Sequence, residues 1–522
     1  MAHEKVKQKV EFGDYQTPDE LAFAVCEMLV GRGLRPRTIV EPTCGTGSFI
    51  KASALLFPEA ERIIGVDINL SHLLQTKAHA TSAKNSERIH LVHDDFFKLD
   101  WRNMFEGLTP PILVIGNFPW VTNAALASIG GANLPIKSNF QKHRGVDAIT
   151  GKSNFDISEW MTIQVVDWLR GRRGAFALLL KTTVARKILQ HIHKAHADIS
   201  YSAIFKIDAE KAFGASIDAC LLFCDFTGDL KGDGCDVFES ISAAKPTKEI
   251  GFKDGVLLNN VRAFEESQSL ALSTAGSGMK WRSGIKHDCS KVMELEDRDG
   301  GLYNRFGERV DIEEDYVFPL FKGSDVANGR TDKPRRHMIV TQRFVGEATL
   351  PIKDIAPKTW TYLKKHQALL DNRKSRIYKN KPSFSIFGVG EYSFSNWKVA
   401  ICSLYKRLHF ESVGPVQGRP VVFDDTVYFV PCRNKREARA ICDLLSSEES
   451  VKFLSAHIFW DSKRPITTSV LNRVNIESLA EMLGRSDEIR GRHDSLPTAQ
   501  DGLPSFLKPP THSAQLAVKK ET

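Results

Sequence analysis

The sequence lacks any run of about 18 consecutive apolar residues, the length that a membrane-spanning helix requires. Its first twelve residues, MAHEKVKQKVEF, are charged and contain no apolar core of the kind found in secretory signals. We therefore expect an unexported, cytoplasmic protein without a membrane partner. The chain has 522 residues, of which 42% are hydrophobic and 26% charged. This composition is typical of globular domains and excludes a disordered or fibrous chain.

Regularly spaced cysteines are also absent. The nine cysteines are scattered along the chain, and none of them forms a CxxC pair. An odd number without regular spacing argues against a disulfide framework and against a zinc ribbon, so we expect reduced thiols and no metal site. The net charge of +8 is mildly basic and suits a polyanionic partner, but it does not select one.

The N-terminal part of the chain alternates helix-period stretches with short apolar runs. We expect a helix over 18–31, opened by a capping box from Thr17 to Glu20. Because only one helix separates the last three apolar runs, we expect the sheet to finish with an antiparallel hairpin. This pattern predicts an α/β, Rossmann-like domain with a mostly parallel sheet over residues 1–240. The seven expected strands are 38–41, 62–68, 88–94, 112–116, 174–181, 202–207 and 218–226.

The pattern changes after this domain. Residues 241–280 are rich in turn-forming residues and are predicted to be a connector. Residues 281–485 combine β-rich patches with basic loops, which indicates an α+β domain. Residues 486–522 are polar and contain several prolines, so we expect a flexible tail.

A glycine-containing turn, Glu41-Pro42-Thr43-Cys44-Gly45-Thr46-Gly47, follows the first expected strand. Glycines at such a turn let the backbone approach a ligand, and the following helix directs N–H groups toward it. Asp67 lies at the end of the next strand, where a carboxylate accepts hydrogen bonds from ribose hydroxyls. The loop and the aspartate together predict a nucleoside cofactor.

The dinucleotide pattern GxGxxG is absent, because position 50 is isoleucine. Glu41 beside the loop would repel a pyrophosphate, so a cationic adenosine ligand without phosphates fits better. S-adenosylmethionine has these properties, and Asp95 and Phe96 after the third strand are candidates for contacting its adenine. The cofactor residues predicted from this pattern are Glu41, Pro42, Thr43, Cys44, Gly45, Gly47, Asp67, Ile68, Asp95 and Phe96.

The fourth expected strand is followed by Asn117-Phe118-Pro119-Trp120. At the carboxyl edge of a parallel sheet, this tetrapeptide offers the side-chain carbonyl of Asn117, the backbone carbonyl of Phe118 and the aromatic face of Trp120. Pro119 favours an extended conformation at Phe118. Two acceptors and a stacking platform suit an exocyclic aromatic amine, which becomes nucleophilic when its N–H groups are bound. We predict that these four residues are catalytic.

In order along the chain, Tyr15-Gln16-Thr17-Pro18, EPTCGTGSF, GVDIN, HDDFF and GNFPW resemble the successive motifs of the γ-class DNA N6-adenine methyltransferases of type II restriction–modification systems. The resemblance covers about residues 11–226. It implies S-adenosylmethionine as cofactor, with Tyr15, Thr17 and Pro18 among its binding residues, and an adenine flipped out of double-stranded DNA as substrate. The family usually has [DN]PP[YF], so Phe118 and Trp120 depart from its tetrapeptide.

The resemblance also implies a target-recognition domain after the methyltransferase domain, a prokaryotic, nucleoid-associated location, and a separate restriction endonuclease for any cleavage. It places a second aromatic face for the flipped base where Phe155 and Trp160 are candidates. The segment 282–291 resembles a recognition loop of the family, and cations interleaved with aromatic and hydroxyl residues suit DNA. The predicted DNA-binding residues in the second domain are Arg282, Ser283, Lys286, His287, Lys291, Arg335, Arg336, Arg373, Lys374 and Arg376.

These observations predict a site-specific DNA adenine-N6 methyltransferase, and they leave other hypotheses open. The enzyme could instead methylate RNA, cytosine N4 or a protein side-chain amide, because closely similar tetrapeptides serve those substrates. A non-catalytic DNA-binding specificity subunit with a degenerate pocket is the remaining alternative, suggested by the two departures in the tetrapeptide.

Overall fold

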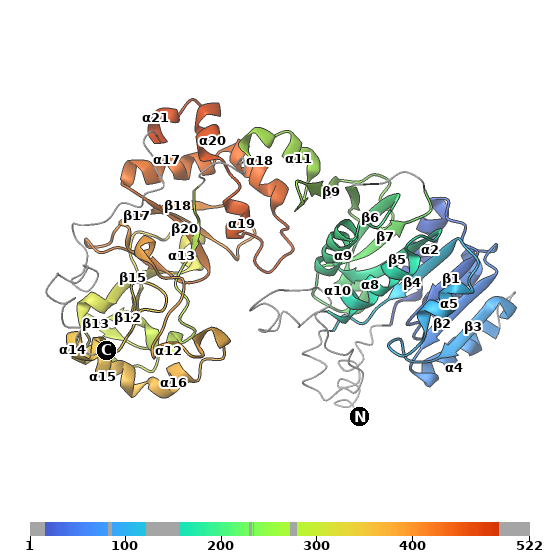
Figure 1. Ribbon diagram of the computed structural model, residues 1–522, viewed down its shortest axis with the longest axis horizontal. Helices are drawn as coiled ribbons and strands as arrows, with labels where there is room; N and C mark the ends of the chain where they lie inside the picture. The colour runs from blue at the N-terminus through green and yellow to red at the C-terminus, as the bar shows by residue number, and fades with distance from the viewer. Residues whose placement is uncertain are drawn as a thin grey trace, which may run out of the picture. The chain divides into compact units, whose positions relative to one another are not determined.

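The computed structural model describes residues 16–81, 86–121, 156–228, 232, 234–271 and 279–489. The chain divides into two compact units, with the boundary between Arg262 and Ala263 (Figure 1). Two of the predicted site residues, Tyr15 and Phe155, lie outside the described residues. No helix in the described part of the chain is long and apolar enough to cross a membrane.

A ten-stranded sheet forms the centre of the N-terminal unit, in the order β10-β9-β8-β6-β7-β5-β4-β1-β2-β3. The strands from β3 to β5 in this order are all parallel, and β7 lies antiparallel between β5 and β6. The α/β, Rossmann-like prediction is confirmed, because each expected strand forms within two residues of its predicted ends. The seven strands are β1 (Thr38–Glu41), β2 (Arg62–Asp67), β3 (Ile89–His93), β4 (Ile112–Asn117), β5 (Gly174–Lys181), β6 (Tyr201–Ile207) and β7 (Ala219–Asp225).

Three further strands extend this sheet beyond the expected seven: β8 (Gly234–Phe238), β9 (Lys248–Lys253) and β10 (Val256–Leu258). β8 pairs in parallel with β6, and β9 and β10 continue as an antiparallel meander. Residues 248–258, which we expected in a connector, are therefore part of the sheet. The sequence does carry a signal for this hairpin, the Asp254-Gly255 dipeptide. Both residues have positive φ, 50° and 73°, as a two-residue hairpin turn requires.

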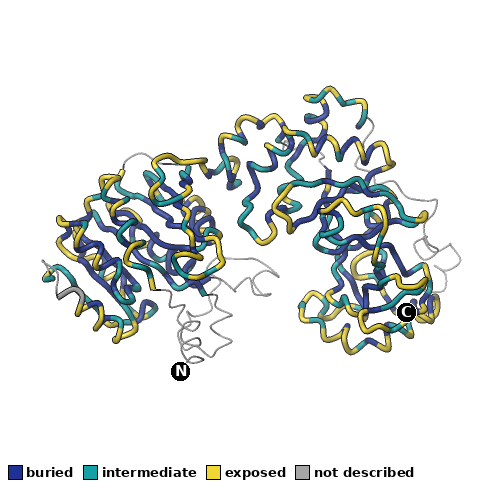
Figure 2. Tube along the Cα trace, turned by 180° about the vertical axis from the view of Figure 1, so that it is seen from behind, coloured by how far each residue is buried: buried dark blue, intermediate teal, exposed yellow. Residues whose placement is uncertain are grey.

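Helices cover the sheet, whose central strands are buried along nearly their whole length (Figure 2). Apolar side chains of α2 and α3 join those of the strands in one core, and α8 and α9 pack on each other and on β5. These helices are α2 (Asp19–Gly31), α3 (Ser48–Leu56), α4 (Leu70–Thr81), α5 (Trp101–Glu106), α8 (Ile157–Leu169), α9 (Thr182–Lys194) and α10 (Ala209–Phe213), and α11 (Val261–Glu265) spans the boundary between the two units.

The start of α2 differs from the prediction. The helix begins after Pro18 and has no side-chain cap, so the expected capping box from Thr17 does not form. Instead, the backbone carbonyl of Thr17 accepts a hydrogen bond from Ser48 Oγ at 2.7 Å. This bond joins the segment before α2 to the first residue of α3.

The C-terminal unit contains a six-stranded sheet, β14-β13-β12-β16-β15-β19, and a four-stranded sheet, β11-β20-β17-β18. The predicted α+β class is confirmed. The strands are β11 (Arg282–Ser283), β12 (Glu294–Arg298), β13 (Gly301–Tyr303), β14 (Arg309–Val310), β15 (Val317–Phe321), β16 (Arg336–Ile339), β17 (Trp397–Cys402), β18 (Phe410–Val413), β19 (Val422–Phe423) and β20 (Val427–Cys432).

The helices of this unit include a C-terminal group in which α17 contacts α18, α20 and α21. The last of them, α21, lies within the segment that we expected to be a flexible tail. Its Ile489 is buried, so the first residues of that segment belong to the folded unit. The helices are α12 (Ser290–Met293), α13 (Gly323–Ala327), α14 (Ile352–Ile355), α15 (Pro357–Lys365), α16 (Gln367–Asp371), α17 (Lys435–Leu445), α18 (Glu448–His457), α19 (Thr468–Leu471), α20 (Ile476–Met482) and α21 (Ser486–Ile489).

Candidate active site

The order in which the parallel strands are added to the sheet reverses between β1 and β4. β1 pairs with β2 on one side and with β4 on the other. Ligands of open α/β sheets bind at the carboxyl ends of the strands at such a switch point. The glycine loop after β1 and the tetrapeptide at the end of β4 both lie there.

The loop between β1 and α3 depends on two glycines. Gly45 and Gly47 have φ values of +49° and +83°, in the left-handed region that other residues rarely adopt. A Cβ on Gly45 would collide with the side chain of Gln16, and a Cβ on Gly47 would collide with Thr76. The loop is therefore pressed closely against its neighbours and needs glycine at both positions.

Asp67, the last residue of β2, holds this loop in place. Its Oδ2 accepts a hydrogen bond from the backbone N–H of Gly45 at 2.8 Å, and its Oδ1 accepts one from Asn69 N–H at 2.7 Å. His72 Nδ1 lies 3.9 Å from Oδ1. Each carboxylate oxygen has a second acceptor direction, so these bonds leave capacity for a ligand hydroxyl.

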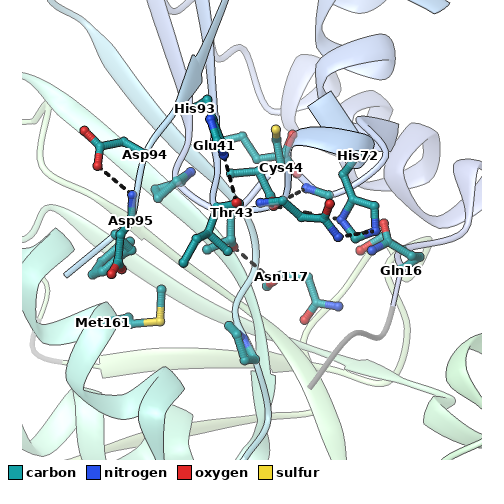
Figure 3. A pocket seen from close by; sticks show the side chains of 18 of the residues that line it. Gln16, Glu41, Thr43, Cys44, His72, His93, Asp94, Asp95, Asn117 and Met161 are labelled. Carbon is teal, nitrogen blue, oxygen red and sulfur yellow. Dashed lines mark hydrogen bonds and ion pairs between the residues drawn. The ribbon is translucent and has the colours of Figure 1, made fainter. Parts of the chain in front are cut away.

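A cavity of about 550 Å³ opens at this edge of the sheet (Figure 3). It brings together most of the predicted cofactor residues and two residues of the tetrapeptide. Among the other predicted residues, Pro18 and Gly47 support the site from outside its lining. The predicted residues that line the cavity are Thr17, Glu41, Pro42, Thr43, Cys44, Gly45, Asp67, Ile68, Asp95, Phe96, Asn117 and Pro119.

Glu41 is the most unusual group in the cavity wall. Its side chain is buried, with 3% of the residue exposed, and its Oε2 has no hydrogen-bond partner among the described residues. Burial raises the pKa of this carboxyl well above its ordinary value, and the charge of Asp67 raises it further. A buried carboxyl oxygen without a donor costs free energy, so this position suits a cationic ligand group.

The tetrapeptide is divided between the cavity and the protein interior. Asn117 and Pro119 line the cavity, and the backbone carbonyl of Asn117 accepts a hydrogen bond from Thr43 Oγ1 at 3.3 Å. The side chain of Phe118 is 1% exposed and packs edge-to-face on Phe96, with 5.7 Å between the ring centroids. This ring is buried in the protein interior and does not line the cavity.

Trp120 occupies a different position from the one that its predicted role requires. It is 6% exposed, its Nε1–H donates to the carbonyl of Leu179 at 3.2 Å, and its ring meets Phe213 edge-to-face at 5.0 Å. The ring belongs to the hydrophobic core and does not line the cavity. A role in base stacking would require one face of the indole to become accessible.

Trp160, the other predicted stacking residue, lies on the first turns of α8. It is partly exposed, and its ring contacts Phe96 at 6.2 Å and Phe97 at 5.4 Å between centroids. Phe96 and Phe97 both line the cavity. Trp160 therefore supports the cavity wall from behind.

The predicted DNA residues of the C-terminal unit fall into three groups, of which the first two are exposed to different degrees. Arg282, Ser283, Lys286 and Arg336 are partly exposed, with Arg282 over the ring of Tyr392 and Lys286 near Asp288. The exposed cations, which are accessible to a phosphate, are Lys291, Arg335, Lys374 and Arg376.

His287 and Arg373 have structural roles that the sequence did not predict. His287 is 6% exposed, its Nδ1 accepts the backbone N–H of Cys289, and its Nε2 lies 3.4 Å from the buried Glu294. Arg373 donates to the backbone carbonyls of Leu370, His287 and Ser385, and its guanidinium lies 3.6 Å from the centre of the Tyr378 ring. Burial lowers the pKa of Arg373. Both side chains hold neighbouring loops together, and His287 is buried whereas Arg373 is partly exposed.

No group of three or more His, Cys, Asp or Glu side chains in the described ranges is arranged to hold a metal ion. The wall of the cavity, with its carboxyls, amide and loop N–H groups, is suited to an organic ligand with positive charge.

Comparison with known proteins identifies the family. No protein-family model matches the chain. It is 49% identical to the type II methyltransferase M.NspV of a Nostoc species over 483 residues, which is 92% of this chain and 100% of that enzyme. A type II methyltransferase of a Paramecium bursaria Chlorella virus, M.CvrRI, is 31% identical over 116 residues, which is 22% of this chain and 26% of the viral one.

Among solved structures, the type IIL restriction-modification enzyme MmeI in complex with DNA shares the fold with a TM-score of 0.50 at 14% identity. The match covers 98% of this chain and 71% of MmeI. The extent and identity of the match to M.NspV, together with the cavity at the switch point of a Rossmann-like sheet, establish that the chain belongs to the type II methyltransferases of restriction–modification systems.

Proposed function

We propose that the protein transfers a methyl group from S-adenosylmethionine to N6 of an adenine flipped out of double-stranded DNA, as the modification component of a restriction–modification system. The observation that carries this proposal is one cavity that combines Glu41, Asp67 and Asn117. The first two suit a cationic nucleoside, and the third suits an exocyclic amine. Any cleavage would come from a separate restriction endonuclease.

The residues of the cavity fit the cofactor. Glu41 has the orphaned buried oxygen that the α-ammonium group would satisfy, and Asp67 retains acceptor capacity for ribose hydroxyls. Asp95 and Phe96 would meet the adenine. When bound, S-adenosylmethionine would supply an electrophilic methyl group on a sulfonium.

The residues of the tetrapeptide suit the acceptor base. The amide oxygen of Asn117 and the backbone carbonyl of Phe118 would accept the N–H hydrogens of the amine, which favours the tetrahedral nitrogen that attacks the methyl. A paired adenine is inaccessible within the duplex, so the nucleotide would have to be flipped out of the stack. The family relationship to M.NspV and the fold shared with MmeI, which was solved with DNA, support duplex DNA as the substrate.

Transfer of a tritiated methyl group from S-adenosylmethionine to long, unmethylated duplex DNA of mixed sequence tests this proposal. After digestion to nucleosides, we expect the label in N6-methyldeoxyadenosine, and S-adenosylhomocysteine should suppress its incorporation. Label in N4-methyldeoxycytidine would contradict the choice of base, and label in RNA alone would contradict the substrate class. DNA binding without any methyl transfer would support the specificity-subunit hypothesis instead.

The exposed cations near the start of the basic run in the C-terminal unit should contribute phosphate contacts. Replacing Lys374 and Arg376 together with alanine should flatten the slope of log affinity against log salt by about 0.9 for each phosphate contact removed. Lys358, whose ammonium pairs with Asp311 at 2.9 Å on the same unit, provides a matched control, and Lys358→Ala should leave the slope unchanged. Titration of fluorescent duplex DNA at several salt concentrations measures both. Equal slopes in all three proteins would mean that this basic run is only a solvated surface.

A further inference from the structure

Lys181, the last residue of β5, makes two contacts that neither the motifs nor the cofactor loop explain. Its ammonium lies 2.9 Å from the backbone carbonyl oxygen of Trp120 and 2.6 Å from Asp156 Oδ2. The side chain of Lys181 is 23% exposed and that of Asp156 is 8% exposed. The ion pair is therefore largely shielded from water. A shielded pair holds a more definite geometry than a pair on an open surface.

Asp156 extends this connection to α8. Its Oδ1 caps the helix by accepting hydrogen bonds from the N–H and Oγ–H of Ser158 at 3.1 and 2.6 Å. The next residue, Ile157, donates its backbone N–H to the carbonyl of Val121 at 2.9 Å. The last residue of the tetrapeptide is thus joined to the start of α8 through Lys181, and the residue after it, Val121, is joined directly by the bond from Ile157.

The tetrapeptide is held at both of its ends. At the first end, Asn117 pairs with Leu179 in the sheet and its carbonyl accepts the hydroxyl of Thr43. At the second end, the indole N–H of Trp120 donates to Leu179 and its carbonyl accepts the ammonium of Lys181. Between these two anchors lie the Asn117 amide and the Phe118 carbonyl, the two acceptors of the proposed chemistry.

We propose that Lys181 is a positioning residue for methyl transfer, and that its ammonium, neutralised by Asp156, fixes the C-terminal end of the tetrapeptide. Lys181 does not line the cavity, so it acts through Trp120 and not on the substrate. A displacement of about 1 Å in reacting groups can cost about a hundredfold in rate. The inference rests on the proposed role of the tetrapeptide, and it assigns to Lys181 an effect on turnover with little effect on ligand binding.

The test compares Lys181→Met with Lys187→Met. Lys187, on α9, forms an ion pair with the buried Glu159 on α8 at 2.5 Å. Both substitutions leave a buried carboxylate of the α8 N-terminal turn without its lysine, but only the first removes a bond to the tetrapeptide. Thermal unfolding of the two variants measures the structural cost that they share.

Single-turnover methyl transfer, at saturating S-adenosylmethionine and mixed-sequence duplex DNA, measures the effect on chemistry. We expect Lys181→Met to lower this rate about 10- to 100-fold with cofactor and DNA dissociation constants within about twofold of wild type. Lys187→Met should keep a rate close to that of wild type. Lys181→Arg, which retains a cationic donor for both acceptors, should recover most of the lost rate.

If Lys181→Met does not fold, Asp156→Asn tests the same connection, because it keeps an oxygen to cap α8 and removes the charge that neutralises Lys181. We expect it to lower the rate, also with unchanged binding. Equal rates for Lys181→Met and Lys187→Met, or a loss in Lys181→Met that appears only as weaker binding, would overturn the inference. If wild-type protein itself transfers no methyl group, the proposed function fails, and this outcome is distinct from a failure of the inference about Lys181.

Discussion

Replacing Asn117 with alanine should lower the rate of methyl transfer roughly 100- to 1000-fold, the usual cost of removing a group that stabilises charge developing in a transition state. Asn117 is partly exposed at the end of β4 and lines the cavity, while its backbone is held by pairing with Leu179 and by Thr43. The substitution removes the amide and leaves these backbone bonds in place. Cofactor and DNA affinities should therefore change little, and the loss should appear in the single-turnover rate.

Two variants serve as controls for this prediction. Asn117→Asp keeps a side-chain oxygen that can accept an N–H hydrogen, so it should retain more activity than Asn117→Ala. Thr43→Val removes the hydroxyl that binds the Asn117 carbonyl but leaves the amide, and should have a smaller effect. Normal single-turnover chemistry in Asn117→Ala, combined with a loss of DNA binding, would contradict the assignment of Asn117 to the chemical step.

Local sequence patterns were sufficient to predict the frame of the site. Strands that are buried on both faces appear in the sequence as continuous apolar runs, as in β5 and β7, so their positions could be predicted closely. Gly45 and Asp67 were predicted to serve one cofactor site, and the structure brings both to the cavity and joins them by a direct hydrogen bond. This second feature lies within one βαβ unit, β1-α3-β2, whose geometry is nearly constant.

The features that the sequence did not predict depend on partners far away in the chain. Lys181 contacts residues 61 and 25 positions earlier, and no local pattern marks it as more than a polar end to an apolar strand. Arg373 was predicted as part of a basic run, but it also donates to the backbone carbonyls of His287 and Ser385, which join it to neighbouring loops. Composition indicates that a segment is basic, but it does not show which of its cations the fold itself uses.

The pH dependence of cofactor binding should reveal Glu41. Because burial and the charge of Asp67 raise the pKa of this carboxyl, it retains its proton to a higher pH in the ligand-free protein than an ordinary glutamate does. A cationic ligand favours the ionised form, so binding should release a proton and affinity should increase with pH until Glu41 is ionised in the free protein. His72 and His93 also line the cavity, so the contribution of Glu41 has to be separated from that of its neighbours.

Glu41→Gln separates these contributions. At pH 8 it should weaken S-adenosylmethionine binding about 10- to 100-fold, the cost of one charge-assisted bond, and any pH dependence that remains would come from groups other than Glu41. Calorimetric titration between pH 6 and 8 measures both effects. S-adenosylhomocysteine, which keeps the α-ammonium group, should behave like the cofactor, whereas methylthioadenosine, which lacks it, should bind both proteins equally.

The same carboxyl should have the opposite effect on stability. A group that binds protons more tightly in the folded state than in the unfolded one makes the free energy of unfolding fall as pH rises above its ordinary pKa. The ligand-free wild type should therefore lose stability between about pH 4.5 and the raised pKa, whereas Glu41→Gln should lose less and be the more stable protein at pH 8. Denaturant unfolding across this range measures the difference. If Glu41→Gln is less stable than wild type at pH 8 and binds S-adenosylmethionine equally well, then Glu41 supports the fold and is not the group that receives the cofactor's ammonium.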